Sequence, residues 1–328
     1  MATTHTYDVI IVGAGPAGMC AALYTGRSML KTVVLERGIP GGELLNTEKL
    51  DDWIGEKSIL GWELANKFYE HAKEFGAEFV TANVTRVRRR HDGTFEAITD
   101  SGDTYNSPAV IITAGGTPVK LGIPGELEFA GKGVSYCAIC DGAFFKQHTI
   151  VVVGGGDAAV EEADFLTRYA DKVYVVHRRD SFRASRILQE RLLANPKIEV
   201  IWNAVAEEVL GDENGLMKGL RIRDVVTDEV RTLDATGCFV FIGFRPNTGI
   251  IDGHFDHDEM GYVLTDTMMA TSIKGLFAAG DLRSQLTRQV TTAVGDATTA
   301  AIAVEKYLKA RAEGGHAVSA HGSGGYAV

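Results

Sequence analysis

Two short runs of mostly apolar, β-branched residues stand out in the hydrophobic pattern of this 328-residue chain. They cover residues 7–12 and 149–153, and each is followed by a glycine-rich turn and then by a helical pattern. A further apolar run follows each helix, at residues 32–35 and 173–176. Strand, glycine turn, helix and strand in this order predict a βαβ unit, so the chain carries that unit twice.

The two glycine turns have the spacing of a dinucleotide-binding motif. They read GAGPAG and GGGDAA, each at the start of a predicted helix. Glycines permit the tight turn and let a pyrophosphate approach the helix N-terminus, where unpaired N–H groups and the helix dipole favour an anion. The residues assigned to these contacts are Gly13, Gly15, Pro16 and Ala17 in the first turn, and Gly154, Gly155, Gly156, Asp157 and Ala158 in the second.

The residue that follows the second strand distinguishes the two copies. The first copy has Glu36, whose carboxylate would accept hydrogen bonds from both ribose hydroxyls and repel a 2′-phosphate. The second has His177 at the same offset, with Arg178, Arg179 and later Arg183 behind it. Guanidinium groups match phosphate oxygens in geometry and charge. The first site is therefore predicted to bind an unphosphorylated dinucleotide and the second to bind NADPH. The alternative interpretation of the arginines is a solvated, cationic helix start.

The pattern after residue 248 is too short and too poor in strands for a third domain. It contains one clear strand at 275–279 and one helix at about 290–311, and we expect it to complete the first domain. The predicted fold is α/β, with two Rossmann-like, three-layer domains, the second inserted in the first. The first comprises residues 1–117 and 248–328, and the second comprises residues 118–247.

The charge balance limits the possible partners. A formal net charge of −10 argues against nucleic acid and anionic membranes, because both require a basic surface. The one basic cluster, Arg86, Arg88, Arg89 and Arg90, precedes a His-Asp-Gly turn and is interpreted as the exposed end of a hairpin. No apolar stretch is long enough to span a bilayer and the N-terminus lacks a signal-peptide pattern, which predicts a cytoplasmic protein. The Gly/Ser/Ala-rich tail, about 314–328, is expected to be disordered.

Cys137 and Cys140 form a Cys-x-x-Cys motif that is followed at once by Asp141. In a helical turn residues i and i+3 share a face, so the two thiols can close a disulfide with little backbone movement. A zinc half-site and an incidental pair of core cysteines are the alternatives, but no second pair supplies the remaining ligands, so no metal is predicted. Asp141 is the nearest proton donor for thiol–disulfide exchange, with an N-cap or surface aspartate as the alternative. Cys20 and Cys238 are expected to be core residues.

Together, these motifs closely resemble the low-molecular-weight thioredoxin reductases of bacteria and lower eukaryotes. The resemblance runs from about Tyr7 to Tyr307 and implies a homodimeric enzyme that uses FAD and NADPH to reduce thioredoxin. The FAD domain would be the discontinuous one, and the inserted domain would bind NADPH and carry the Cys-x-x-Cys motif. Beyond the glycine turns, the FAD contacts that it implies are Glu36, Arg37, Gly41, Gly42, Glu43, Asn46, Val84, Gly280, Asp281, Arg288, Gln289 and Val290. The NADPH contacts that it implies are His177, Arg178, Arg179, Arg183, Ile242 and Gly243.

The same resemblance implies a role for each member of the redox motif. Cys140 would face the flavin and receive its electrons, Cys137 would attack the thioredoxin disulfide, and Asp141 would act as the acid and base. The family alternates between two arrangements of the inserted domain, and the crossings at 117–120 and 243–248 are where a hinge is expected.

Three positions depart from the family pattern. Glu43 stands where glutamine is usual, which puts a negative charge near the predicted pyrimidine edge of the flavin. The segment 51–55 lacks the usual proline before its glycine, and Ala297 replaces a common glycine. We expect the first departure to alter the flavin potential or its hydrogen bonding, and the other two to be packing variants.

The same motifs argue against three other functions. A ferredoxin- or flavodoxin-NADP reductase of this fold has no use for the Cys-x-x-Cys motif, and a dithiol oxidase needs no NADPH site. A non-catalytic NADP(H)-sensing or redox-sensing flavoprotein would not require an acid beside the dithiol. The motifs therefore favour the thioredoxin reductase function over these alternatives.

Overall fold

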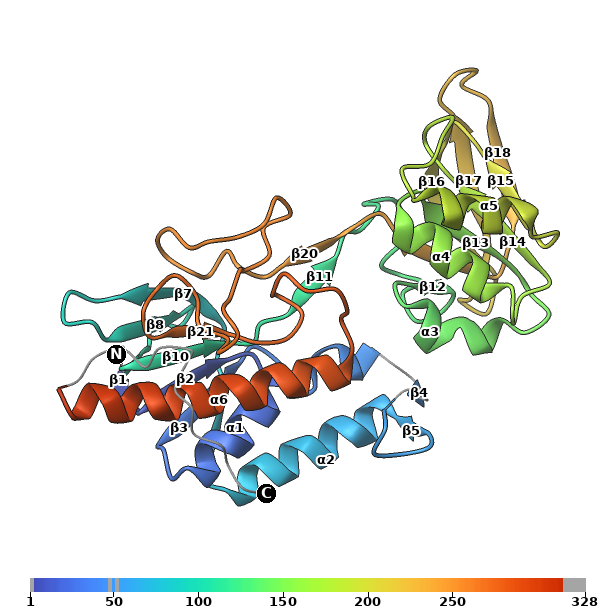
Figure 1. Cartoon of the computed structure of the whole chain (residues 1–328). Helices are drawn as coiled ribbons and strands as arrows, with labels where there is room; N and C mark the ends of the chain where they lie inside the picture. Colours follow the sequence, from blue (N-terminus) through green and yellow to red (C-terminus); the bar gives the residue numbers. More distant parts are fainter. Residues whose placement is uncertain (1–2, 47–48, 51–52, 315–328) are drawn as a thin grey trace. The chain divides into compact units, whose positions relative to one another are not determined.

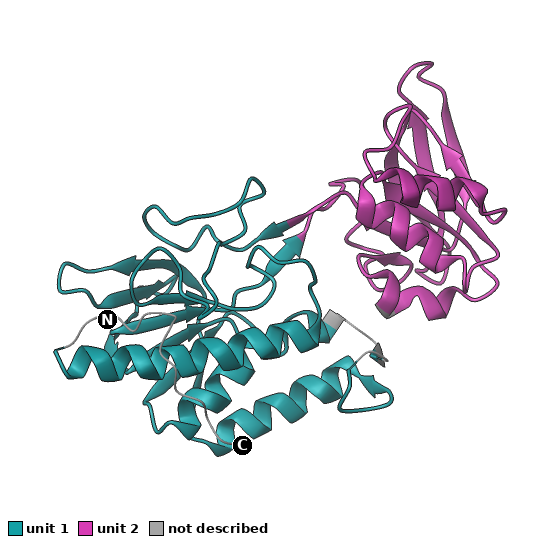
Figure 2. Cartoon of the chain, viewed as in Figure 1, with its two compact units in different colours: residues 1–46, 50–117, 245–328 teal, residues 47–49, 118–244 magenta. Residues whose placement is uncertain are grey.

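The computed structural model describes residues 3–46, 49–50 and 53–314. The tail that was predicted to be disordered lies outside the described residues, except for Gly314. The described chain divides into two compact units, which Figure 2 shows in separate colours. Unit 1 consists of residues 1–46, 50–117 and 245–328, and unit 2 consists of residues 47–49 and 118–244.

Unit 1 takes its elements from both ends of the chain (Figure 1). Its first elements are β1 (Thr4–Thr6), β2 (Val9–Val12), α1 (Pro16–Arg27), β3 (Thr32–Glu36), the 3-10 helix η1 (Gly42–Asn46), β5 (Ile59–Leu60), α2 (Gly61–Glu74), β6 (Glu78–Thr81), β7 (Val84–Arg89), β8 (Phe95–Thr99), β9 (Thr104–Ser107) and β10 (Ala109–Ile112). The short strand β4 (Lys49–Leu50) pairs with β5. The carboxyl-terminal elements are β21 (Leu276–Ala278) and α6 (Val290–Ala312).

The core of unit 1 is a five-stranded parallel sheet in the order β21-β10-β2-β3-β6. Strands β2 and β10 are buried along their whole length, as is typical of a parallel sheet that is covered on both faces. Successive side chains of β2 point to opposite faces, so Ile11 packs with α1 and α6 whereas Ile10 packs with residues of β7 and β8. The unit is therefore three layers: helices, the parallel sheet, and a second sheet in the order β1-β9-β8-β7.

Unit 2 repeats this architecture. Its elements are β12 (Val134–Ser135), α3 (Ala138–Asp141), the 3-10 helix η2 (Gly142–Phe145), β13 (Thr149–Gly154), α4 (Asp157–Leu166), β14 (Lys172–Val176), α5 (Arg186–Ala194), β15 (Ile198–Ile201), β16 (Ala204–Gly211), β17 (Met217–Asp224), β18 (Val230–Asp234) and β19 (Gly237–Phe241). A parallel sheet in the order β12-β19-β13-β14-β15 packs on α4 and α5 through one face and on the antiparallel sheet β16-β17-β18 through the other. The predicted fold, with two Rossmann-like domains and the second inserted in the first, is confirmed.

The two chain crossings between the units are paired with each other. Strands β11 (Gly116–Pro118) and β20 (Phe244–Pro246) form a two-stranded sheet. On the unit 2 side, the Val119 N–H donates to the Gly243 carbonyl at 2.9 Å, and on the unit 1 side the Asn247 N–H donates to the Gly115 carbonyl at 3.0 Å. After this ribbon the chain returns to unit 1, where β21 pairs with β10 in register Val110 with Leu276.

No helix among the described residues is both long and apolar enough to cross a membrane. No group of three or more His, Cys, Asp or Glu side chains within them could hold a metal ion. The basic cluster at residues 86–90 lies at the end of the β7–β8 hairpin, where Arg88 pairs with Glu96 at 2.5 Å.

Candidate functional site

The first glycine turn brings the chain very close to itself. Gly13 has a φ of +103°, and a Cβ there would lie 2.7 Å from the Thr113 carbonyl oxygen, so only glycine fits. Gly15 precedes α1 as its N-cap, and Pro16 is the first residue of that helix. A Cβ on Gly42 would lie 2.9 Å from the Gly15 Cα, so the 41–42 segment packs directly on the turn. The helix N-terminus beside these glycines leaves backbone N–H groups for an anion.

The carboxylate of Glu36 lies beside the same turn. It accepts the Ala14 N–H through Oε2 at 2.7 Å and the Gly38 N–H through Oε1 at 3.0 Å. A carboxylate has about four lone-pair sites, so these two bonds leave capacity for two further donors. Two adjacent ribose hydroxyls are such donors, which is the role predicted for Glu36.

Asp281, directly after β21 and Gly280, presents a buried polar atom. Its Oδ1 is buried and has no hydrogen-bond partner among the residues that the structure describes. Burial raises the pKa of this carboxyl to about 6, with Arg288 lowering it and Glu43 raising it. A buried acceptor without a donor costs free energy, so this oxygen fits a hydroxyl-bearing ligand.

The residues predicted to lie along a flavin ring come just before α6. The Arg288 guanidinium lies 4.1 Å from the centre of the Tyr262 ring, in a cation–π contact. Gln289 caps α6, and its N–H donates to the Thr292 hydroxyl at 3.1 Å. Val290 is the first residue of that helix.

The second glycine turn rests on the residue that corresponds to Glu36. The ring of His177 lies so close to Gly155 that a Cβ there would be 2.2 Å from it. His177 is only 6% exposed, its Nε2 is 3.0 Å from the Ser181 carbonyl, and burial lowers its pKa. The structure therefore places His177 beneath the glycine turn, where it supports the turn instead of facing solvent.

Hydrogen bonds also tie the following basic loop to this turn. The Arg183 N–H donates to the Gly155 carbonyl at 2.8 Å. The Ser185 N–H donates to Oδ1 of Asp157, the first residue of α4, at 2.7 Å. The loop is therefore held next to the N-terminus of α4, which is the predicted pyrophosphate site.

The three arginines of that loop are available for a ligand. Arg178, Arg179 and Arg183 are exposed, and within the described part of the chain their side chains have no hydrogen bond or ion pair. The other two residues predicted for NADPH, Ile242 and Gly243, follow β19 and are also exposed. Parallel sheets bind ligands at the carboxyl ends of their strands. The glycine turn, the arginine loop and Ile242 follow the carboxyl ends of β13, β14 and β19.

The redox motif lies at the short helix α3. Cys137 is half-buried and disulfide-bonded, whereas the side chain of Cys140 lies outside the described residues. The Ser135 hydroxyl donates to Oδ2 of Asp141 at 2.5 Å, and the Cys137 N–H donates to the Ser135 oxygen at 3.1 Å. One buried hydroxyl therefore holds both the backbone of the first cysteine and the carboxylate that follows the motif.

The two remaining cysteines are free. Cys238 is fully buried in β19, and burial raises its pKa to about 12. The Cys20 thiol donates to the Val294 carbonyl at 3.3 Å, and burial raises its pKa as well. Both are thiols at neutral pH, as expected of core cysteines.

Comparisons with known proteins agree in pointing to one family. A family model described as pyridine nucleotide-disulphide oxidoreductase matches residues 7–297. A thioredoxin reductase of Bacillus subtilis is 47% identical over 310 residues, which cover 94% of this chain and 97% of that protein. The chain belongs to the thioredoxin reductases.

Solved thioredoxin reductases have the same fold. The enzyme from Streptococcus pyogenes is 43% identical, with a TM-score of 0.82 over 93% of this chain and 98% of that one. The enzyme from Lactococcus lactis, in its FR conformation, is 42% identical, with a TM-score of 0.69 over 92% of this chain and 99% of that one. The family that was predicted from the sequence is confirmed.

Some residues of this thioredoxin reductase that shape the site were not found by sequence reasoning. Ser135 precedes the Cys-x-x-Cys motif without a recognisable spacing, and only the fold brings it to Asp141. Arg283 and Asp296 form a largely buried ion pair at 2.7 Å, and Asp296 also accepts the Gly280 N–H at 3.2 Å. Their positions in the sequence carry no signal, because the pair joins a loop to α6.

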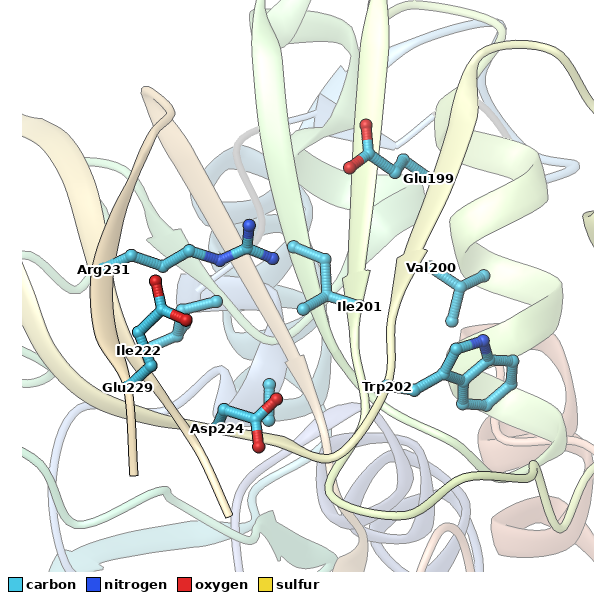
Figure 3. Close-up of a pocket in the computed structure, with 9 residues that line it drawn as sticks. Glu199, Val200, Ile201, Trp202, Ile222, Asp224, Glu229 and Arg231 are labelled. Carbon is cyan, nitrogen blue, oxygen red and sulfur yellow. The ribbon is translucent and has the colours of Figure 1, made fainter. Parts of the chain in front are cut away.

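The remaining residues that were predicted to contact FAD differ in how far they are buried. Val84 is buried at the start of β7, Arg37 is exposed after β3, and the side chain of Asn46 lies outside the described residues. A separate cavity of about 290 Å³ lies in unit 2, between β15 and the strands β16–β18. Figure 3 shows residues that line it. It is lined in part by Glu199, Trp202 and Arg231, and no residue predicted for a nucleotide or for the redox centre lines it.

Proposed function

We propose that this chain is an NADPH-dependent thioredoxin-disulfide reductase, with FAD in unit 1 and NADPH in unit 2. The observation that carries the proposal is the redox centre, where the disulfide-bonded Cys137 and the Ser135-held Asp141 lie on one helical turn. The alternatives without a working dithiol leave this arrangement unexplained. The net reaction is NADPH, a proton and thioredoxin disulfide giving NADP⁺ and thioredoxin dithiol.

The residues of unit 1 fit FAD. Glu36 has capacity for the ribose hydroxyls, the N-terminus of α1 faces the pyrophosphate, and Asp281 offers an unused acceptor to the ribityl hydroxyls. When bound, FAD supplies the step between a two-electron hydride donor and a disulfide. Gly41, Gly42, Glu43, Asn46, Val84, Gly280, Arg288, Gln289, Val290 and Arg37 complete the proposed set.

The residues of unit 2 fit NADPH. Gly154, Gly155 and Gly156 lead into α4, whose N-terminus receives the pyrophosphate. Arg178, Arg179 and Arg183 bind the 2′-phosphate. His177, Asp157 and Ala158 hold or border the glycine turn. Ile242 and Gly243 lie at the end of the neighbouring strand.

The dithiol chemistry belongs to this chain's own residues. Two electrons break the Cys137–Cys140 disulfide, leaving a thiolate at each sulfur until protons are taken up. Cys137 attacks the thioredoxin disulfide, and Cys140 then resolves the mixed disulfide and restores the original bond. Asp141 holds and transfers a proton at this centre, and Ser135 fixes the orientation of its carboxylate.

The proposal extends to assembly and location. The protein acts as a cytoplasmic homodimer on thioredoxin or a thioredoxin-like protein, as the sequence resemblance implies. Sedimentation of the purified flavoprotein measures its oligomeric state directly.

An anaerobic NADPH titration followed by visible absorbance tests the function. The wild type should take up four electrons and a Cys137→Ser, Cys140→Ser variant two, because flavin and dithiol each hold two. Uptake of two electrons by both proteins would show that the cysteines are outside the electron path, and a reductase of one-electron carriers would then explain the chain better.

A further inference from the structure

Asp281 lies in a tight turn that follows β21. The turn comprises residues 280–283, and it is closed by a hydrogen bond from the Arg283 N–H to the Gly280 carbonyl at 3.0 Å. Gly280 has a φ of +80°, and a Cβ there would lie 3.0 Å from the Cβ of Ala17. The turn therefore packs closely on the first residues of α1, which follow the first glycine turn.

A single carboxylate from α6 joins the two ends of this turn. Oδ2 of Asp296 accepts the Gly280 N–H at 3.2 Å and lies 2.7 Å from a terminal nitrogen of Arg283. The Asp296 and Arg283 side chains are each only 13% exposed. Charge-assisted hydrogen bonds are stronger than neutral ones, and exclusion of solvent strengthens them further. Asp296 therefore fixes both the residue before Asp281 and the last residue of the turn.

Further hydrogen bonds hold the partners of Asp296. The Arg283 Nε donates to the Thr265 hydroxyl at 2.8 Å, which orients the guanidinium. The Gln285 Nε2 donates to the Gly280 carbonyl at 3.2 Å, so both polar backbone groups of Gly280 are engaged. The backbone on which Asp281 depends is therefore held by side chains from outside the turn.

The side chain of Asp281 takes no part in these bonds. Its Oδ1 is buried and has no hydrogen-bond partner among the residues that the structure describes. A buried acceptor without a donor costs free energy, and it persists only where the surrounding structure fixes it. The position of this oxygen therefore depends on the turn, and the turn depends on Asp296.

We propose that Asp296 and Arg283 are a positioning pair for FAD, which holds the 280–283 turn so that Oδ1 of Asp281 meets a hydroxyl of the ribityl chain. Asp281 is the group that touches the cofactor, and the pair acts through it. The inference rests on the proposed FAD site in unit 1. Without the pair, the turn would be in the binding conformation for a smaller fraction of the time, and the affinity would fall by that fraction.

The test is binding of FAD to the apoprotein, followed by flavin fluorescence. Asp296→Asn removes the charge that holds Arg283 at nearly constant shape, and it should raise the dissociation constant about tenfold. Asp281→Asn should raise it by a similar factor, because an amide oxygen accepts less strongly than a carboxylate. Glu305→Gln, an exposed change on the same helix, should leave it at the wild-type value.

Combining Asp281→Asn with Asp296→Asn distinguishes positioning from a general structural role. If Asp296 acts through Asp281, the second change should raise the dissociation constant by no more than about twofold, whereas two independent effects would multiply to about a hundredfold. A hundredfold loss would overturn the proposal, and so would wild-type affinity in Asp296→Asn.

A variant without either charge covers the case in which Asp296→Asn does not fold. That change leaves the Arg283 guanidinium largely buried without its counter-ion, which is strongly destabilising. Arg283→Gln with Asp296→Asn removes both charges and should show the same loss of about tenfold, again with little further loss on adding Asp281→Asn. Wild-type affinity in this variant would contradict the proposal, whereas failure of the wild type to bind FAD would overturn the proposed site itself.

Discussion

Strands β3 and β14 are the second strands of the two βαβ motifs. The residue at the end of each one contacts the glycine turn of its own motif. Glu36 does so with a hydrogen bond to Ala14, and His177 does so by placing its ring on Gly155. The histidine can do this because Phe182 and Trp202 surround it, with ring centres 5.4 and 6.1 Å away. In the proposed NADPH site, the choice of nucleotide is therefore expected to depend on the arginines that follow His177.

Replacing Arg178 and Arg179 together by alanine should raise KM for NADPH ten- to a hundredfold while changing KM for NADH little. The reason is that a lost charge-assisted contact to the 2′-phosphate is worth roughly 1.5–3 kcal/mol, and NADH lacks that group. Steady-state kinetics with both nucleotides measures the ratio. Arg191→Ala, an exposed change on α5, is the matched control, and an equal loss with NADH would remove the phosphate site from this loop.

Ser135→Ala should slow thioredoxin reduction about tenfold and leave flavin reduction by NADPH at the wild-type rate. The hydroxyl donates to Asp141 and accepts from the Cys137 backbone, so the substitution removes from the carboxylate a hydrogen bond worth roughly 1.5 kcal/mol. Stopped-flow absorbance separates the two half-reactions. Slowing of both to the same extent would mean that the change is structural.

At the scale of elements, a buried carboxylate joins the strand before the redox helix to the loop after β11. Glu126 is 1% exposed and accepts the Leu121 N–H at 2.8 Å, the Gly122 N–H at 2.7 Å and the Tyr136 hydroxyl at 2.9 Å. Tyr136 directly precedes Cys137, and burial together with the hydrogen bond to Glu126 raises the pKa of its hydroxyl. The loop and the redox helix are therefore held as one body within unit 2.

Glu126→Ala should destabilise unit 2 by about 2–4 kcal/mol, because three part-buried hydrogen bonds to one carboxylate are lost. Hydrogen exchange of β12 and β19 should become faster by a corresponding factor, while exchange of β2 and β10 in unit 1 should stay unchanged. Glu128→Ala, an exposed change two residues away, is the control. Unchanged exchange in β12 and β19 would show that water replaces the carboxylate without cost.

Elements that lie in a sustained apolar run were predictable, and short strands outside such runs were not. The helix expected at 290–311 spans Val290–Ala312, and the strand expected at 275–279 spans Leu276–Ala278, because each has a sustained apolar pattern. Strands β11, β12 and β20 lie in no such apolar run, and each is paired with a strand that is distant in the sequence.

At the scale of the whole molecule, the nucleotide turns were predictable because each is a local motif in one stretch of sequence. The surroundings of Asp281 were not, since Glu43, Tyr262 and Asp296 reach it from distant parts of the chain. For the same reason, the charge of Glu43 could be noted from the sequence, but its effect on the pKa of Asp281 could not. A local motif lies within one stretch of sequence, whereas the electrostatic interaction between distant residues depends on the folded structure.

The paired crossings have a consequence for synthesis on the ribosome. Strand β10 of unit 1 ends at Ile112, but its neighbour β21 begins only at Leu276, after all of unit 2 has been made. The emerging chain therefore exposes an apolar sheet edge while the later unit, whose two ends meet at Val119 and Gly243, can already close. The unit that is translated first is thus the last to be completed.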